Sequence, residues 1–191
     1  YGFRTLSTPT INHGVDKMSD RPRSDTQQLI ASANLSWETG LGTIRSITGY
    51  VKTDDYFTTD FSGTGALLGA SDPRAEQVSE ELQLQGTAFN DKLNYLLGAY
   101  WFTEDGDQDF AWYLAVLGGA TSTSQIKAST DSYSFFGQAD YAITDQLKVT
   151  AGIRWVTDDK DFLLNFQRRT PIPLGPLTDR VQLKNKYTET T

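Results

Sequence analysis

The sequence contains no cysteine, and this absence removes several kinds of chemistry at once. Disulfides, thiol catalysis and thiolate metal centres are all excluded. The chain has one histidine, His13, in a mixed segment (1–25) that we predict to be a loop. A lone histidine without a second His or Cys nearby does not indicate a metal site.

Long apolar runs are also absent, so no stretch of about 18 residues could form a transmembrane helix. Hydrophobic residues make up 38% of the chain, which is low for a helical membrane protein but ordinary for a membrane β-barrel with a polar inner face. Residues 1–14 contain neither an initiator Met nor a charged region followed by an apolar one. We therefore interpret the chain as an interior piece of a longer one.

Basic charge is scarce, since 24 Asp and Glu oppose 17 Lys and Arg, for a net charge of −7. No cluster of Lys and Arg is interleaved with aromatics, so nucleic acid is not an expected partner. The sequence has no phosphate-binding glycine motif, and no Ser/His/Asp set can be built on one histidine. Glu80 and Glu81 would point to opposite faces of a strand and cannot act as a catalytic pair. We expect neither an enzyme nor a cofactor.

What the sequence does contain is alternation, most clearly in segment 79–105. Polar and leucine residues alternate over 81–85, and every second residue over 93–101 is large or apolar. A period of two indicates strands, and the short polar segment 89–92 between them is typical of a hairpin turn. One face of this hairpin carries aliphatic residues with Tyr95 at the tight end and Trp101 toward the open end, opposite a Glu/Gln face. Membrane-spanning barrel strands have this composition, although a soluble sandwich uses the same alternation.

Two further hairpins follow the same plan. Segment 26–38 alternates strongly and turns at 39–42 into a strand over 43–57, whose facing stays open because apolar residues fall on both phases. Segment 131–143 turns at 144–146 into 147–159, and another strand could begin near 181–187. Segments 58–74 and 106–130 are rich in Gly, Ser, Thr and Asp and are predicted to be long loops, although the second could include a strand extension over 109–116.

Strands of about a dozen residues, short turns at one end and long loops at the other are typical of outer-membrane barrels. We predict an all-β, antiparallel transmembrane β-barrel meander of about six to seven strands, with short periplasmic turns and long extracellular loops. Both ends of the chain fall in loop segments, and the strands are too few for a closed barrel of about eight or more. The chain is therefore expected to be an arc of a larger barrel, with outer-membrane lipid and the remainder of the barrel as neighbours.

The alternation assigns a facing to individual side chains. The residues predicted to face lipid are Leu29, Leu35, Trp37, Leu82, Leu84, Tyr95, Leu97, Trp101, Val149, Ile153 and Trp155. The residues predicted to face the lumen are Glu81, Gln83, Gln85, Gln138 and Arg154. If the chain were a soluble β-sandwich, the aliphatic members of the first set would instead pack against a second sheet.

Candidates for ligand contact are the aromatic residues of segment 106–130, because external aromatic side chains can stack on flat ligands. These residues are Phe110, Trp112 and Tyr113. The alternative for them is a strand that continues above the membrane with ordinary aromatic packing.

The densest acidic cluster is Glu104, Asp105, Asp107 and Asp109, and carboxylates in a loop could bind Ca²⁺. The spacing lacks the glycine and the terminal glutamate of a calcium loop, and a similar acidic run recurs at 158–161. We favour a solvated external loop and expect no metal.

Several segments resemble the barrel of TonB-dependent receptors. They are SITGY (46–50), SEELQLQG (79–86), LNYLLGAYWFTEDG (93–106) and the pair of strands over 134–162, and the resemblance covers about 28–162. It implies a barrel of about twenty-two strands in the outer membrane, of which this chain would hold about a third. It also implies energy-coupled import of scarce solutes, most commonly iron–siderophore complexes.

Parts of that family have no counterpart in this sequence, namely the plug domain, the N-terminal coupling box and the final aromatic-ended strand. Residues 1–191 are therefore expected to be a fragment of one barrel domain, best covered over 26–162. Its implied partners are the parent's plug and a TonB-type coupling protein, which would bind through the missing N-terminal region. A passive porin-like barrel and a soluble β-sandwich binding module remain alternatives, and the sequence leaves the transported solute open.

Overall fold

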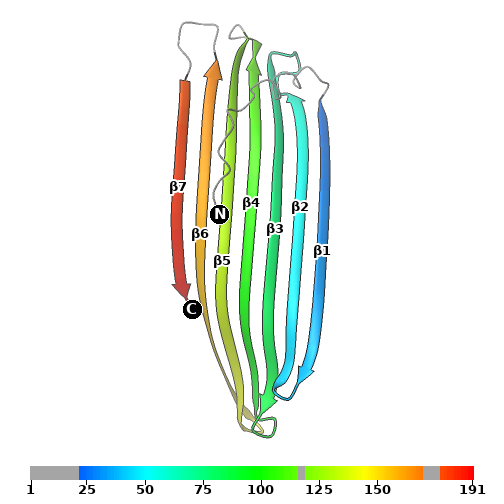
Figure 1. The fold of residues 1–191 in the computed structure, drawn as a ribbon, viewed down its shortest axis with the longest axis vertical. Helices are drawn as coiled ribbons and strands as arrows, with labels where there is room; N and C mark the ends of the chain where they lie inside the picture. Colours follow the sequence, from blue (N-terminus) through cyan, green and yellow to red (C-terminus); the bar gives the residue numbers. More distant parts are fainter. Residues whose placement is uncertain (1–21, 116–118, 170–176) are drawn as a thin grey trace.

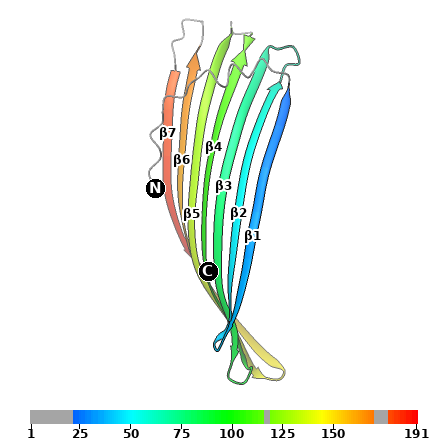
Figure 2. The same ribbon diagram turned by 45° about the vertical axis from the view of Figure 1, so that its right-hand side comes forward.

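The described residues form one antiparallel sheet of seven strands, as predicted. The structure is a computed structural model that describes residues 22–115, 119–169 and 177–191. Each strand pairs with its neighbours in sequence, giving a simple meander in the order β1 to β7. Figures 1 and 2 show a single curved layer of long ribbons. The strands are β1 (Arg23–Thr39), β2 (Gly42–Asp60), β3 (Leu67–Ala88), β4 (Leu93–Leu114), β5 (Ala120–Thr144), β6 (Leu147–Arg169) and β7 (Leu177–Thr190).

The three tight turns lie together at one end of the sheet, which we call the turn end, opposite the loop end (Figure 1). Between β3 and β4, residues Phe89, Asn90 and Asp91 all have positive φ, from 57° to 64°, which reverses the chain within the polar segment predicted as a turn. Between β5 and β6, the Thr144 hydroxyl oxygen accepts hydrogen bonds from the amides of Gln146 and Leu147. Short polar sequences therefore close each hairpin through local hydrogen bonds or backbone geometry.

The loop end differs from the prediction of long loops over 58–74 and 106–130. The strands continue through most of both segments, and the connections shrink to 61–66 and 115–119. The pairing is continuous, from Leu67 opposite Leu114 to Ala88 opposite Leu93. Composition was misleading here because Ser, Thr and Asp are compatible with a strand whose faces border water and whose backbone hydrogen bonds are all paired.

The structure also changes the expected start of the first strand and settles the facing of β2. Residues 23–25, predicted as loop, begin β1, whereas His13 lies outside the described residues. The undecided facing of β2 is set by its register, in which Ile44 lies opposite Trp37 and Leu84. Ile47 falls on the other face, opposite Glu81.

The described residues contain no second sheet and little buried core. The fully buried apolar side chains among them are mostly small, such as Ala70 and Ala111. The aliphatic side chains that a sandwich would bury are open, with Leu35 69% exposed and Ile153 64% exposed. The described segments also contain no helix with the length and hydropathy needed to cross a membrane.

Candidate functional site

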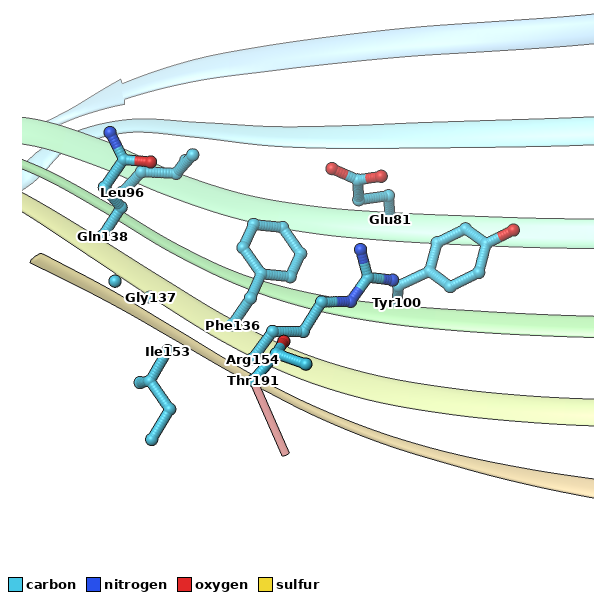
Figure 3. Close-up of a pocket in the computed structure, with 10 residues that line it drawn as sticks. Glu81, Leu96, Tyr100, Phe136, Gly137, Gln138, Ile153, Arg154 and Thr191 are labelled. Carbon is cyan, nitrogen blue, oxygen red and sulfur yellow. The ribbon is translucent and has the colours of Figure 1, made fainter. Parts of the chain in front are cut away.

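The register divides the side chains between two faces, because residues directly opposite in an antiparallel pair lie on the same side. We define face A by the row Leu84, Leu97, Gly137 and Ile153, which are paired in turn across β3 to β6. Face B is the other side, defined by the row that contains Gln83. Figure 3 shows Ile153 pointing away from the side chains of face B.

Face A carries an apolar band near the turn end. All eleven residues predicted to face lipid lie on this one face by register. Tyr95 and Trp37 lie near the tight turns, whereas Trp101 and Trp155 lie toward the loop end. The ring of Trp155 stacks on Phe135 at 6.0 Å between centroids. Aromatic residues therefore bound the aliphatic band on both sides.

Glu80 interrupts this band with a carboxylate on face A, beside Trp101. Its two oxygens accept hydrogen bonds from the hydroxyls of Ser46 at 2.6 Å and Thr48 at 2.5 Å, both from β2. The alternation in segment 79–105 did not single this residue out. The two hydroxyls satisfy a group that would otherwise be costly on an apolar face.

Face B near the turn end is polar, and all five residues predicted to face the lumen lie on it. Three of them, Glu81, Gln138 and Arg154, line a hollow of about 600 Å³ (Figure 3). Arg154 donates through Nη2 to the Ser134 hydroxyl at 3.1 Å, and its guanidinium lies 5.8 Å from the centre of the Phe136 ring.

The Phe136 ring lies directly over Gly98 of the neighbouring strand. A Cβ at position 98 would come within 2.1 Å of this ring, so only glycine leaves room for it. The sequence alternation did not identify Phe136 or Tyr100 as members of this hollow, because an aromatic residue on a polar face breaks the expected pattern.

Above the line of Trp101, Tyr133 and Trp155, face A changes from apolar to charged. The loop-end part of the sheet comprises residues 51–60, 67–78, 102–114, 120–132, 158–167 and 179–187. Its face A carries Lys52, Asp54, Asp72, Arg74, Glu76, Asp105, Asp107, Asp109, Lys127, Asp131, Asp159, Asp161, Arg180, Lys184 and Lys186.

Opposite charges are paired across strands on this part of face A. Lys184 of β7 pairs with Asp161 of β6, and Arg74 of β3 approaches Asp54 of β2 at 3.9 Å. Burial raises the pKa of the Asp109 carboxyl, and the nearby charge of Asp72 adds to the shift. Such a surface requires water or polar neighbours.

Face B changes in the opposite sense over the same residues. It becomes apolar and aromatic, with Phe57, Phe102, Phe110, Trp112, Ile126, Phe162, Leu164, Phe166, Val181 and Leu183. The amphipathic character of the sheet is therefore inverted between its two ends.

The structure separates the three aromatics predicted to contact a ligand. Phe110 and Trp112 lie together on face B, with ring centroids 4.8 Å apart in an edge-to-face arrangement. Tyr113 lies on face A, where it packs with Leu68 beside Ala70 and Ala111. These residues belong to β4 and not to a loop, so strict alternation divides them.

Two further rings, which the sequence alternation did not indicate, pack against Phe110 and Trp112 on face B. Phe57 lies 6.4 Å from Phe110, and Phe61, from the connection after β2, lies 5.0 Å from Trp112. The continued period of two through Phe162, Leu164 and Phe166 was the sequence signal that could have indicated an apolar loop-end face.

The acidic cluster is likewise part of a strand and is divided. Asp105, Asp107 and Asp109 lie on face A, whereas Glu104 lies on face B. Within the described ranges, no three or more ligand-type side chains are grouped so that they could hold a metal ion.

Comparison with known proteins gives a consistent family. A model described as "TonB dependent receptor-like, beta-barrel" matches residues 1–188. The solved structure of the ferric yersiniabactin uptake receptor FyuA from Yersinia pestis matches with a TM-score of 0.69 and 13% identity, over 93% of this chain and 28% of that one. Among curated proteins, no sequence matches this chain significantly.

Two other solved receptors match more weakly. The ferric citrate transporter FecA has a TM-score of 0.47 at 10% identity, over 92% of this chain and 27% of that one. The ferric-catecholate import receptor Fiu from E. coli K12 has a TM-score of 0.44 at 12% identity, over 90% and 30%. The chain thus spans less than a third of the length of these receptors.

The matched family consists of receptors and transporters and is not an enzyme class. Its β-barrels are outer-membrane proteins, and its members in general work with a plug domain and a TonB partner. The long antiparallel meander described above is the wall of such a barrel. The chain belongs to the TonB-dependent receptor β-barrel family.

Proposed function

We propose that this chain is part of the barrel wall of an outer-membrane receptor that imports scarce solutes by energy-coupled transport. The proposed cargo is an iron–siderophore complex. Membership of the family and the fold shared with FyuA, whose name describes ferric yersiniabactin uptake, support this proposal. The observation that carries it is the apolar band of face A, bounded by aromatics and backed by a polar face B.

In this proposal, face A at the turn end contacts lipid, and face B at the turn end lines the lumen. Burying a band such as that around Leu97 in lipid removes apolar surface from water, which is favourable. The hollow beside Glu81 and Arg154 offers polar groups that a plug domain could hydrogen-bond. A TonB-type protein would engage the parent receptor outside this chain and would supply the energy for transport.

Uptake by the intact parent receptor tests the transport proposal. Cells that lack their other iron receptors are supplied with a radioactive ferric siderophore complex, with and without the coupling protein. We expect accumulation only when both the receptor and the coupling protein are present. Accumulation that persists without the coupling protein would instead indicate a passive porin-like barrel.

Partition of the purified chain between buffer and detergent micelles tests the membrane assignment against a soluble module. We expect aggregation in buffer and a strand signal in far-UV circular dichroism that appears only with detergent, because the sheet exposes its band and two unpaired edges. A monomer that melts cooperatively in plain buffer would refute the membrane assignment and favour a soluble binding module.

A further inference from the structure

The loop-end part of face B is an apolar surface on a sheet whose opposite face is charged. Rings from β2, β4 and the connection 61–66 form a continuous patch of Phe57, Phe61, Phe110 and Trp112. Phe61 is 55% exposed even though it touches Trp112. The other three rings, Phe57, Phe110 and Trp112, are partly exposed, so the patch offers apolar surface to another molecule.

The backbone beneath the patch lets its rings lie close to the sheet. Gly69 lies opposite Trp112, and a Cβ at position 69 would come within 2.9 Å of the Phe61 ring and 3.4 Å of the Trp112 ring. Glycine at this position therefore leaves room for two rings to lie against the backbone. The result is a broad, shallow aromatic surface instead of separate protruding side chains.

The charge on this part of face B is acidic. Among its described side chains, one ammonium group, Lys160, is present against four carboxylates, those of Asp55, Glu104, Asp158 and Asp179. Glu104 is exposed at the middle of β4. A molecule with several negative charges would meet repulsion here, and the side chains described on this part of face B offer it no cluster of cations.

We propose that this surface binds the cargo of the receptor and that it selects solutes that bear aromatic rings and carry no net negative charge. The inference rests on the proposed function, because it places face B on the inner side of a barrel entered from the loop end. Ring stacking on the patch supplies the affinity, and the carboxylates discriminate against anions.

The test uses the purified intact parent receptor and three ferric complexes whose shells differ in one property at a time. The tropolonate complex is neutral and has three rings, the catecholate complex has three rings but is triply negative, and the acetohydroxamate complex is neutral without rings. Retention of radioactive iron by the receptor measures each affinity. We expect the tropolonate complex to bind at least about tenfold more tightly than either of the others. One stacked ring pair contributes enough for roughly that factor over the acetohydroxamate complex, and repulsion by the carboxylates weakens binding of the catecholate complex.

Variants locate the binding on the patch. We expect Trp112→Ala to weaken binding of the tropolonate complex about tenfold, and Trp112→Phe, which keeps a ring, to stay within about threefold. Trp101→Ala removes an equal ring from face A and should leave this affinity unchanged. Glu104→Lys replaces a carboxylate by an ammonium group and leaves all rings of the patch in place. It should improve binding of the catecholate complex several-fold.

The outcomes separate this inference from the proposed function. Equal affinity for the catecholate and tropolonate complexes, or an unchanged affinity in Trp112→Ala, would overturn the inference, and the patch would then be covered by another part of the receptor. Coupling-dependent iron uptake could still be observed in that case, and the proposed function would stand. Loss of coupling dependence in the uptake assay would instead defeat the proposed function itself.

Discussion

At the scale of single residues, the two faces of the sheet predict opposite tolerance for charge. Leu97 lies in the middle of the face A band and is 53% exposed in the isolated sheet, whereas Gln83 lies on face B one strand away. Both side chains are accessible, so the difference between them is the medium that each face contacts. That difference can be measured only in a bilayer.

We expect Leu97→Arg to destabilise the intact receptor in bilayers by about 2–4 kcal/mol, the cost of an arginine near mid-depth in lipid. The matched change Gln83→Arg on face B should cost less than about 1 kcal/mol, because a charge there stays solvated. Denaturant unfolding from lipid vesicles measures both values. Equal costs for the two variants would contradict a lipid-facing face A.

Glycine positions also carry specific packing. We expect Gly98→Ala to cost about 1–3 kcal/mol, because the new methyl group would overlap the Phe136 ring. Gly106→Ala is the matched control, since its nearest atom would be the Arg74 carbonyl oxygen at 3.6 Å, an ordinary contact. In a Phe136→Ala background, most of the cost of Gly98→Ala should disappear, and a cost that stays the same in this double-mutant cycle would refute the contact.

At the scale of elements, the connection 61–66 is ordered by one carboxylate. Asp60 accepts hydrogen bonds from the amide and hydroxyl of Ser62, at 3.0 and 2.6 Å, and from the amide of Gly65 at 2.6 Å. The Ser62 hydroxyl oxygen in turn accepts from the Ala66 amide at 2.9 Å. These bonds replace the ladder where β2 ends, and they present Phe61 to the aromatic patch.

The hydrogen bonds from Ser62 and Gly65 lower the pKa of Asp60 below its ordinary value of 3.8. A lowered pKa means that Asp60 contributes stability above pH 3.8 and that this contribution is lost as the pH falls through the folded-state value. We therefore expect proteolytic cleavage within 61–66 to accelerate only in strongly acidic solution. Asp60→Ala should accelerate cleavage at neutral pH and remove the acid dependence, and a variant that keeps the dependence would show that another group is responsible.

At the scale of the whole molecule, the inversion of the faces marks a boundary across the sheet. Below the line of Trp101, Tyr133 and Trp155, face A is apolar and face B polar, and above it the assignment is reversed. If the strands leave the lipid at this line, face A must change from apolar to charged there, because it passes from contact with lipid to contact with water. The loop-end part of the strands should therefore stand outside the membrane.

Cysteine mapping tests this boundary, and the absence of native cysteine from this chain makes it practical. In a parent receptor without other cysteines, we expect Asp105→Cys and Asp107→Cys to react with a membrane-impermeant maleimide on intact cells. Leu97→Cys and Ala99→Cys, on the same face and strand, should be protected by lipid. Labelling of all four positions at similar rates would argue against the boundary.

Much of this architecture could be predicted from local patterns, because alternation in a strand directly reports which side chains share a face. The turns at 39–42, 89–92 and 144–146, and the placement of Leu82 and Gln85 on opposite faces of the sheet, followed from the sequence alone. The extent of the strands did not, because Ser, Thr, Gly and Asp in 58–74 and 106–130 resemble loop residues until a partner strand supplies their hydrogen bonds.

The sequence by itself thus determined the class of fold and the apolar band, since both depend on periodicity within one strand, and several of its segments resembled those of the family. The tertiary structure decided what depends on pairing between strands. It placed Ile44 of β2 on face A, separated Tyr113 from Phe110 and Trp112, and brought Phe57 and Phe61 to those two rings from another part of the chain. These contacts join residues about fifty positions apart, and only the register of the sheet fixes which of them meet.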